Sequence, residues 1–183
     1  EPARLVFGVV FATWTDRGHL QQSYLDALIA DIVAAQLPPV SSVFVGGGTP
    51  TLVDPDGLAA VLRAIPTVGD AEVTVECNPD DVTVDMFRTY RAAGVNRVSI
   101  GVQSMVPSVL ASLGRTHVPA NVVRAVEAVH AAGIPTFNLD LIYGGAGETL
   151  DDWRATLEGA LALQPFHVSA YALTVEAATP LAL

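Results

Sequence analysis

Lysine is absent from this sequence of 183 residues, and all nine of its basic residues are arginines. P-loop, Schiff-base and pyridoxal-phosphate chemistries each need a lysine at their centre, so these classes are excluded. Cys77 is the single cysteine, which excludes an intramolecular disulfide and a cysteine-rich metal site. The formal net charge of -10 argues against a nucleic-acid or anionic-membrane surface, because phosphate binding needs clustered basic residues.

Long apolar runs are also missing. Hydrophobic residues make up 51% of the chain, yet no run approaches the roughly 18 apolar residues of a membrane span. A buried parallel sheet, whose strands are almost continuously apolar, explains such a composition. The start "EPARLVFGVV" has neither an initiator Met nor a signal-peptide pattern, and the end "VEAATPLAL" has no helix stop. We therefore expect one cytoplasmic domain over residues 1–183, truncated at its C-terminus, and leave membrane contact open.

Strand and helix patterns alternate along the chain. Strands are predicted at 4–10, 40–45, 71–79, 95–103, 134–144 and 167–176. Helices are predicted at 19–36, 54–65, 83–94, 107–113, 119–133 and 149–163. The buried face of the first helix is expected to carry Leu20, Tyr24, Leu25, Leu28, Ile32 and Val33. Strands separated by helices and short loops predict right-handed β-α-β units and a parallel sheet, either doubly wound or barrel-like.

Ligands of both architectures bind at the carboxyl ends of the strands, where this sequence places polar residues. The second strand runs into three glycines, Gly46 to Gly48, which favour a close approach to the main chain. Glu76, Gln103 and Asp140 follow at the ends of later strands. Each has an ordinary structural alternative: a tight turn for the glycines, helix caps for the acids and a satisfied buried amide for Gln103. Cys77 is expected to pack as a small apolar side chain, and the histidines show no paired metal-ligand spacing.

Six motifs, taken in order, resemble one family. They are "VFVGGGTPTLV", "VTVECNPDDV", "GVNRVSIGVQS", "LGRTH", "NLDLIYGGAGET" and "HVSAYALTVEAATPLA". Together they are similar to the oxygen-independent coproporphyrinogen III oxidases of the radical S-adenosylmethionine (SAM) proteins, and most to their HemW-like haem-chaperone branch. The resemblance covers nearly the whole chain. It implies an α/β fold, an incomplete (β/α)6 TIM-like barrel with a parallel sheet, and bound SAM.

The resemblance also implies a set of SAM-binding residues. They are Gly47, Gly48, Thr49, Glu76, Gln103, Arg115, Asp140, Ile142 and Ala172. The glycine stretch would face the methionine and adenine ends of the cofactor. Arg115 suits the methionine carboxylate, for which a guanidinium is a two-pronged match. Gln103 and Asp140 suit the ribose hydroxyls, and Ile142 and Ala172 suit the adenine face.

Departures from the family pattern concern the iron–sulfur cluster. In the family, three cysteines spaced CxxxCxxC after the first strand ligate a 4Fe-4S cluster that cleaves SAM. Here "LVFGVV" runs directly into "FATWTDRG" at Val10 and Phe11, and the cysteine loop between these flanks is missing. Either the written sequence joins the two sides of a mobile loop, which we favour, or the protein lacks the loop and is a binding module. A second departure is "YGGAGET", where the family usually has a proline before its glycine. We assign no catalytic and no metal-binding residue.

Three functions remain open. The first is a radical SAM protein of porphyrin and haem metabolism related to coproporphyrinogen III oxidase. The second is a chaperone that binds haem and passes it to an acceptor protein without oxidase activity. The third is an unrelated barrel enzyme that uses Glu76 and Asp140 as acid and base. An exposed sheet edge predicts association into a dimer.

Overall fold

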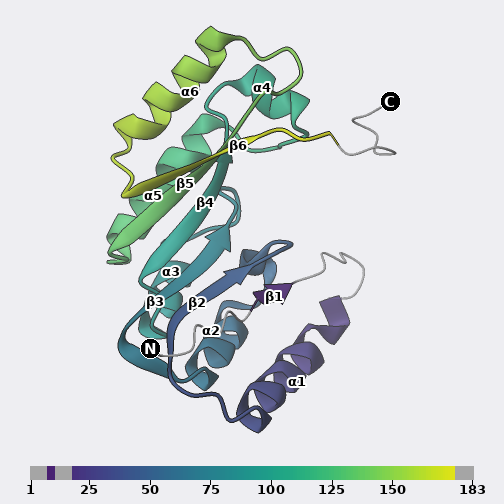
Figure 1. Ribbon diagram of the computed structural model, residues 1–183, viewed down its shortest axis with the longest axis vertical. Helices are drawn as coiled ribbons and strands as arrows, with labels where there is room; N and C mark the ends of the chain where they lie inside the picture. The colour runs from purple at the N-terminus through teal and green to yellow at the C-terminus, as the bar shows by residue number, and fades with distance from the viewer. Residues whose placement is uncertain (1–7, 11–17, 176–183) are drawn as a thin grey trace.

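The computed structural model describes residues 8–10, as backbone only, and residues 18–175. The strands are β1 (Gly8–Val10), β2 (Val40–Gly46), β3 (Thr67–Cys77), β4 (Arg97–Gln103), β5 (Thr136–Tyr143) and β6 (His167–Ala172). The α-helices are α1 (Gln21–Ala34), α2 (Pro55–Ala64), α3 (Val84–Ala92), α4 (Pro107–Ser112), α5 (Pro119–Ala131) and α6 (Leu150–Ala162). Two short 3-10 turns, η1 (Gly18–Leu20) and η2 (Pro50–Leu52), complete the elements (Figure 1).

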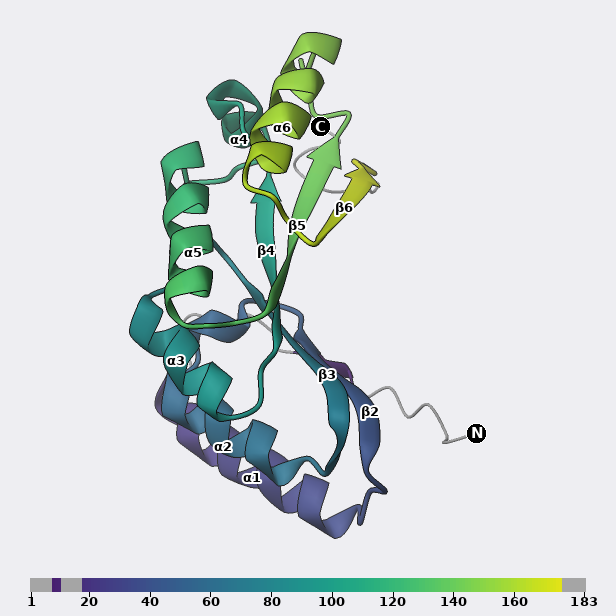
Figure 2. The same ribbon diagram turned by 90° about the vertical axis from the view of Figure 1, so that its left-hand side faces the viewer.

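The six strands form one parallel sheet in the order of the chain, β1-β2-β3-β4-β5-β6. A doubly wound sheet reverses its strand order at a switch point, and this sheet does not. The sheet curls, and the helices cover its outer face (Figure 2). Consecutive neighbours, a constant direction and this curvature confirm the incomplete TIM-like barrel and remove the doubly wound alternative.

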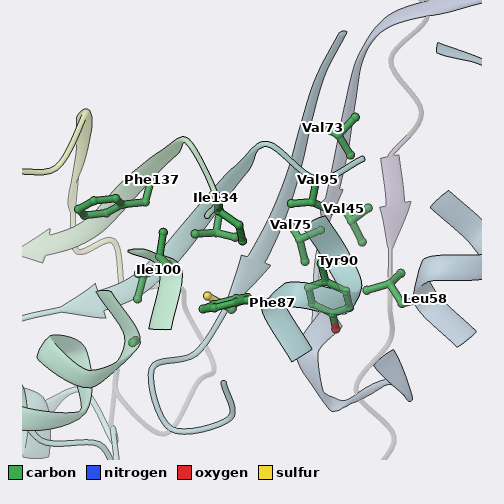
Figure 3. Close-up of a cluster of buried hydrophobic side chains, with 14 of the residues drawn as sticks. Val45, Leu58, Val73, Val75, Phe87, Tyr90, Val95, Ile100, Ile134 and Phe137 are labelled. Atoms are coloured by element: carbon green, nitrogen blue, oxygen red, sulfur yellow. The ribbon is translucent and has the colours of Figure 1, made fainter. Parts of the chain in front are cut away.

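The core lies between the sheet and its covering helices. Alternate strand residues, such as Val73 and Val75 in β3 and Val98 and Ile100 in β4, point outward and are buried. They pack against helix residues that include Leu58 of α2 and Phe87 and Tyr90 of α3 (Figure 3). The residues between them face the inside of the curl and are mostly polar. This division places the hydrophobic core outside the barrel and a polar surface within it.

Local signals set the ends of several helices. Asp54 caps α2, because its carboxylate accepts the Gly57 N–H at 2.8 Å. Thr149 and Asp152 form a reciprocal capping box at the start of α6. Gly94 and Gly133 follow α3 and α5 with φ of +102° and +71°, the left-handed conformation that ends a helix. Each of these caps involves residues that are close neighbours in the sequence.

Some expectations differ from the structure. Only Leu25 and Ile32 of α1 are buried, whereas Tyr24 and Val33 of the predicted face are exposed. The reason is that α1 lies at the edge of the sheet and packs chiefly against α2, which covers a narrow strip of it. Strand β3 begins four residues earlier than expected, at Thr67, and β6 ends at Ala172. Residues 4–7 of the first predicted strand, Phe11 at the junction with Val10 and Glu176 of the last predicted strand lie outside the described ranges. No helix of the described residues is long and apolar enough to cross a bilayer.

Candidate functional site

A cleft of about 190 Å³ opens where β2, β3, β4 and β5 end. Its lining contains the carboxylates of Glu76 and Asp140 and the guanidinium of Arg115. Four of the eight remaining lining residues carry an amide or a hydroxyl, so the cleft offers many hydrogen-bonding groups and little apolar surface. The arrangement suits a small polar ligand that carries both hydroxyl and charged groups.

The glycine stretch after β2 forms one wall. A Cβ at Gly46 would lie 2.8 Å from Oε2 of Glu76, so no larger residue fits there while Glu76 keeps its position. Gly47 and Gly48 have φ of +82° and +41°. The Gly47 N–H donates to Oε2 of Glu76 at 3.1 Å. Gly46 is needed for close approach and the next two glycines for left-handed backbone, which together bring the main chain against the Glu76 carboxylate.

The end of β4 is irregular at the cleft. Gln103 has φ of +62°, which is uncommon for a residue with a side chain, and the pairing with β5 shifts between Gly101 and Gln103. A Cβ at Gly101 would lie 2.8 Å from Nε2 of Gln103. The Gln103 amide therefore lies against the bare backbone of Gly101, and the irregularity turns this amide into the cleft.

Arg115 comes from the loop that follows α4. Its N–H donates to the Leu110 carbonyl at 2.9 Å, which closes the end of the helix. Two residues later the buried His117 ring forms a 2.9 Å hydrogen bond through Nε2 with the carbonyl of Val102 in β4. Since Val102 directly precedes Gln103, this bond ties the Arg115 loop to the strand end that carries Gln103.

Asp140 lies in β5 and faces the inside of the curl. The Ser99 hydroxyl donates to its Oδ2 at 2.6 Å, and the Asn138 amide donates to its Oδ1 at 2.8 Å. On the opposite side of the cleft, the Asn78 amide donates to Oγ1 of Thr49 at 3.3 Å. These bonds hold polar side chains from different strands in fixed positions at one rim.

Cys77 contributes to the lining and is buried. Burial raises the pKa of its thiol far above the usual range, and the nearby carboxylates of Asp140, Asp81 and Glu76 raise it further. The side chain is 4% exposed and therefore remains a neutral thiol, as the sequence predicts. No group of three or more His, Cys, Asp or Glu side chains in the described part of the chain is arranged to hold a metal ion.

The loop after β5, which departs from the family pattern, is closed by a carboxylate. Oε2 of Glu148 accepts the N–H groups of Gly144 and Gly145 at 2.6 and 3.0 Å. Gly144 and Gly147 have φ of +81° and +76°, so glycines supply the turn where the family usually has a proline.

Six of the nine predicted site residues line the cleft. They are Gly48, Thr49, Glu76, Gln103, Arg115 and Asp140. Gly47 is beside it and is bonded to Glu76. Ile142 and Ala172 lie outside the lining, near the ends of the paired strands β5 and β6.

Other lining residues were absent from the predicted set. Pro50, Asn78, Ser99 and Gly101 also line the cleft but are not among the residues that the family resemblance implies. A signal for Ser99 exists in the sequence: Ser99, Gly101 and Gln103 alternate with the apolar residues of β4 and therefore share one face.

Comparisons with known proteins give a consistent result. A family model described as the radical SAM superfamily matches residues 12–160. The haem chaperone HemW of Escherichia coli K12 is 40% identical over 159 residues, which cover 85% of this chain and 42% of the relative. The haem chaperone HemW of Mycobacterium tuberculosis H37Rv is 44% identical over 158 residues, which cover 83% of this chain and 40% of the relative. The chain thus spans about two fifths of the length of these relatives.

Solved structures share the fold at lower identity. The coproporphyrinogen III oxidase HemN of Escherichia coli, a radical SAM enzyme, superposes with a TM-score of 0.76 at 24% identity, over 86% of this chain and 38% of that one. The radical SAM methyltransferase TsrM of Kitasatospora setae gives a TM-score of 0.68 at 17% identity, over 88% and 32%. At these identities the structural similarity establishes the shared fold alone.

Proposed function

The chain belongs to the radical SAM superfamily, and from this membership we propose that its strand-end cleft binds S-adenosylmethionine. The observation that supports the proposal most is the set of polar groups gathered there. Arg115 is the cationic group of the lining and suits the methionine carboxylate. Asp140 and Gln103 suit the ribose hydroxyls, and the exposed backbone of Gly47 and Gly48 lets the methionine end lie close to the chain.

The remaining predicted residues extend this assignment. Ile142 and Ala172 lie near the neighbouring ends of β5 and β6, where an adenine ring that projects from the small cleft would rest. Glu76 carries the charge that suits the cofactor's ammonium group. When bound, SAM supplies a reactive sulfonium centre at this rim.

The iron–sulfur cluster of the superfamily does not fit this sequence. Three thiolate ligands are needed, and the chain contains Cys77 alone, buried as a neutral thiol in β3. We therefore propose SAM binding without a redox step. Intact mass spectrometry tests the premise: a polypeptide of 19.1 kDa carries no cluster ligands. A heavier chain with cysteine-containing peptides between Val10 and Phe11 would overturn it.

For the wider role, we propose haem handling in the manner of the HemW relatives rather than coproporphyrinogen oxidation. Two observations favour it: the relatives with the higher identity are named haem chaperones, and oxidation would need the cluster whose ligands are missing here. An acceptor protein for haem belongs to the same proposal, as does a dimer through the outer edge of β6, which pairs with no further strand among the described residues. Haem titration followed by absorbance, with coproporphyrinogen turnover in parallel, separates the two roles. Turnover without stoichiometric haem binding would reverse the assignment.

SAM binding is tested by isothermal titration calorimetry of the purified chain. Asp140→Ala is expected to weaken binding by about tenfold or more, as for the loss of hydrogen bonds to a charged group. Asp31→Ala provides the matched control, because Asp31 is an exposed acid on α1 far from the strand ends. Equal affinities of the Asp140 variant and the control would refute the assignment. Static light scattering that shows a strict monomer would remove the dimer.

A further inference from the structure

A polar cluster, buried in β4 and β5 and partly exposed in β6, lies on the inner face of the sheet beneath Asp140. It consists of Ser99 in β4, Asn138 in β5 and Ser169 in β6. The strand register pairs Ser99 with Asn138 and Asp140 with Ser169, so these side chains share one face and lie side by side. Asn138 is 1% exposed and Ser99 is 4% exposed. Burial of so many polar atoms is favourable only when each is hydrogen-bonded.

Asn138 is the centre of the cluster. Its amide nitrogen donates to Oγ of Ser99 at 2.7 Å and to Oδ1 of Asp140 at 2.8 Å. Its amide oxygen accepts the Ser169 hydroxyl at 3.2 Å. Both amide hydrogens are thereby used, and the amide plane is held from three strands.

The direction of each bond in the cluster is determined. Turning the Asn138 amide over would bring its oxygen against the Asp140 carboxylate, which has only acceptors when ionised. Since Asn138 donates to Ser99, the single Ser99 hydrogen is left for Oδ2 of Asp140, to which it donates at 2.6 Å. Both Asp140 oxygens are therefore held by neutral donors, and each keeps acceptor capacity on its other side.

We propose that Asn138 is a positioning residue, which together with Ser99 holds the Asp140 carboxylate as a fixed pair of acceptors for two neighbouring hydroxyls of a bound nucleoside. This inference rests on the proposed binding of SAM and adds a residue outside the cleft lining to it. A carboxylate without these two donors rotates about its terminal bond and must lose that freedom when the ligand binds. The hydrogen bonds of the cluster fix the Asp140 carboxylate before the ligand binds, so binding costs less rotational freedom.

Asn138→Ala tests the proposal, with calorimetric affinity for SAM as the measurement. It is expected to weaken binding by about tenfold, the usual effect of losing one hydrogen bond to a charged group. Thr74→Val is the matched control, because Thr74 is a buried hydroxyl residue of the same sheet face that bonds to Glu72 and Arg97. The control should keep wild-type affinity.

Asn138→Asp adds a second measurement, the pH dependence of the affinity for SAM, which would not change if Asn138 had a purely structural role. Near pH 5 the introduced carboxyl, sharing a proton with Asp140, can still donate to it, whereas near pH 8 two adjacent carboxylates repel. The affinity of this variant relative to wild type should therefore fall by about tenfold between these two pH values. The other ionisable groups nearby are Glu76, Cys77 and Arg115 of the cleft, together with His167, the register partner of Asn138 in β6, and Arg97, which bonds to His167 at 3.1 Å. All five are present in both proteins, so their contribution largely cancels in the ratio.

Adenosine and 2′,3′-dideoxyadenosine separate positioning from general damage to the fold. The Asn138→Ala variant should lose affinity for adenosine and bind the dideoxy compound as wild type does. An equal loss for both ligands, or a flat pH ratio for Asn138→Asp, would overturn the proposal. Failure of the wild type to bind SAM or adenosine would overturn the proposed function instead. If the Asn138 variants do not fold, Ser99→Ala tests the proposal in the same way: it should lose affinity for adenosine and keep wild-type affinity for 2′,3′-dideoxyadenosine.

Discussion

Tyr90 presents a buried polar atom whose removal should stabilise the protein. The side chain lies on α3, is 0% exposed and packs in the core with Phe87 and Leu58 (Figure 3). Its hydroxyl has no hydrogen-bond partner within the described ranges. Burial raises the pKa of this hydroxyl well above its usual range, with smaller contributions from Cys77 and Asp54, so the group is neutral at physiological pH.

The expected gain from Tyr90→Phe follows from this burial. A buried hydroxyl left without a partner costs about 1–3 kcal/mol, and phenylalanine keeps the ring while removing the oxygen. The small space left by the oxygen offsets part of the gain, so we expect the free energy of unfolding to rise by about 1 kcal/mol. For a chain of this length, that change raises Tm by about 2–4 °C.

Urea unfolding followed by circular dichroism measures the difference, provided that the m-value stays constant. Phe87→Ala serves as a calibration of packing at the same helix, with an expected loss of about 3–5 kcal/mol because Phe87 is 0% exposed. Destabilisation of the Tyr90→Phe variant by more than about 0.5 kcal/mol would show that the hydroxyl is satisfied, and would refute the reasoning.

Three further predictions follow from other sites. Gly101→Ala should displace the Gln103 amide, because the added Cβ would lie 2.8 Å from its Nε2. Calorimetry should then show SAM binding weakened by about fivefold. Unchanged affinity would show that Gln103 does not contact the ligand. Cys77 should react with a thiol reagent only after unfolding, since its pKa is raised by burial, and fast labelling of the native protein would contradict this. Hydrogen bonds from Thr149 lower the pKa of Asp152, so its contribution to stability is present above the unfolded value of about 3.9 and is lost at lower pH; an acid-unfolding profile that Asp152→Asn leaves unchanged would argue against it.

Much of the site follows from chain order alone. Parallel strands that succeed one another place their carboxyl ends along one rim, so residues as far apart as Gly48 and Asp140 come to one cleft. The motifs at the strand ends therefore identified most of the polar lining. A buried parallel sheet is expected to have continuously apolar strands, and this expectation gives Ser99 no role, although the alternation that places it on the inner face is present in β4.

Other features depend on tertiary contacts. The sequence pattern of α1 predicts a broad buried face, but its place at the sheet edge leaves only Leu25 and Ile32 buried. The left-handed backbone of Gln103 arises where the β4–β5 register shifts, and no local pattern predicts that shift.

The sequence by itself determined the alternation of strands and helices, the caps of α2 and α6 and the strand-end position of Asp140, because these depend on neighbouring residues. The tertiary structure alone decided which polar groups surround Asp140. Ser99, Asn138 and Ser169 belong to three strands, and only the register of these strands brings their side chains within hydrogen-bonding distance.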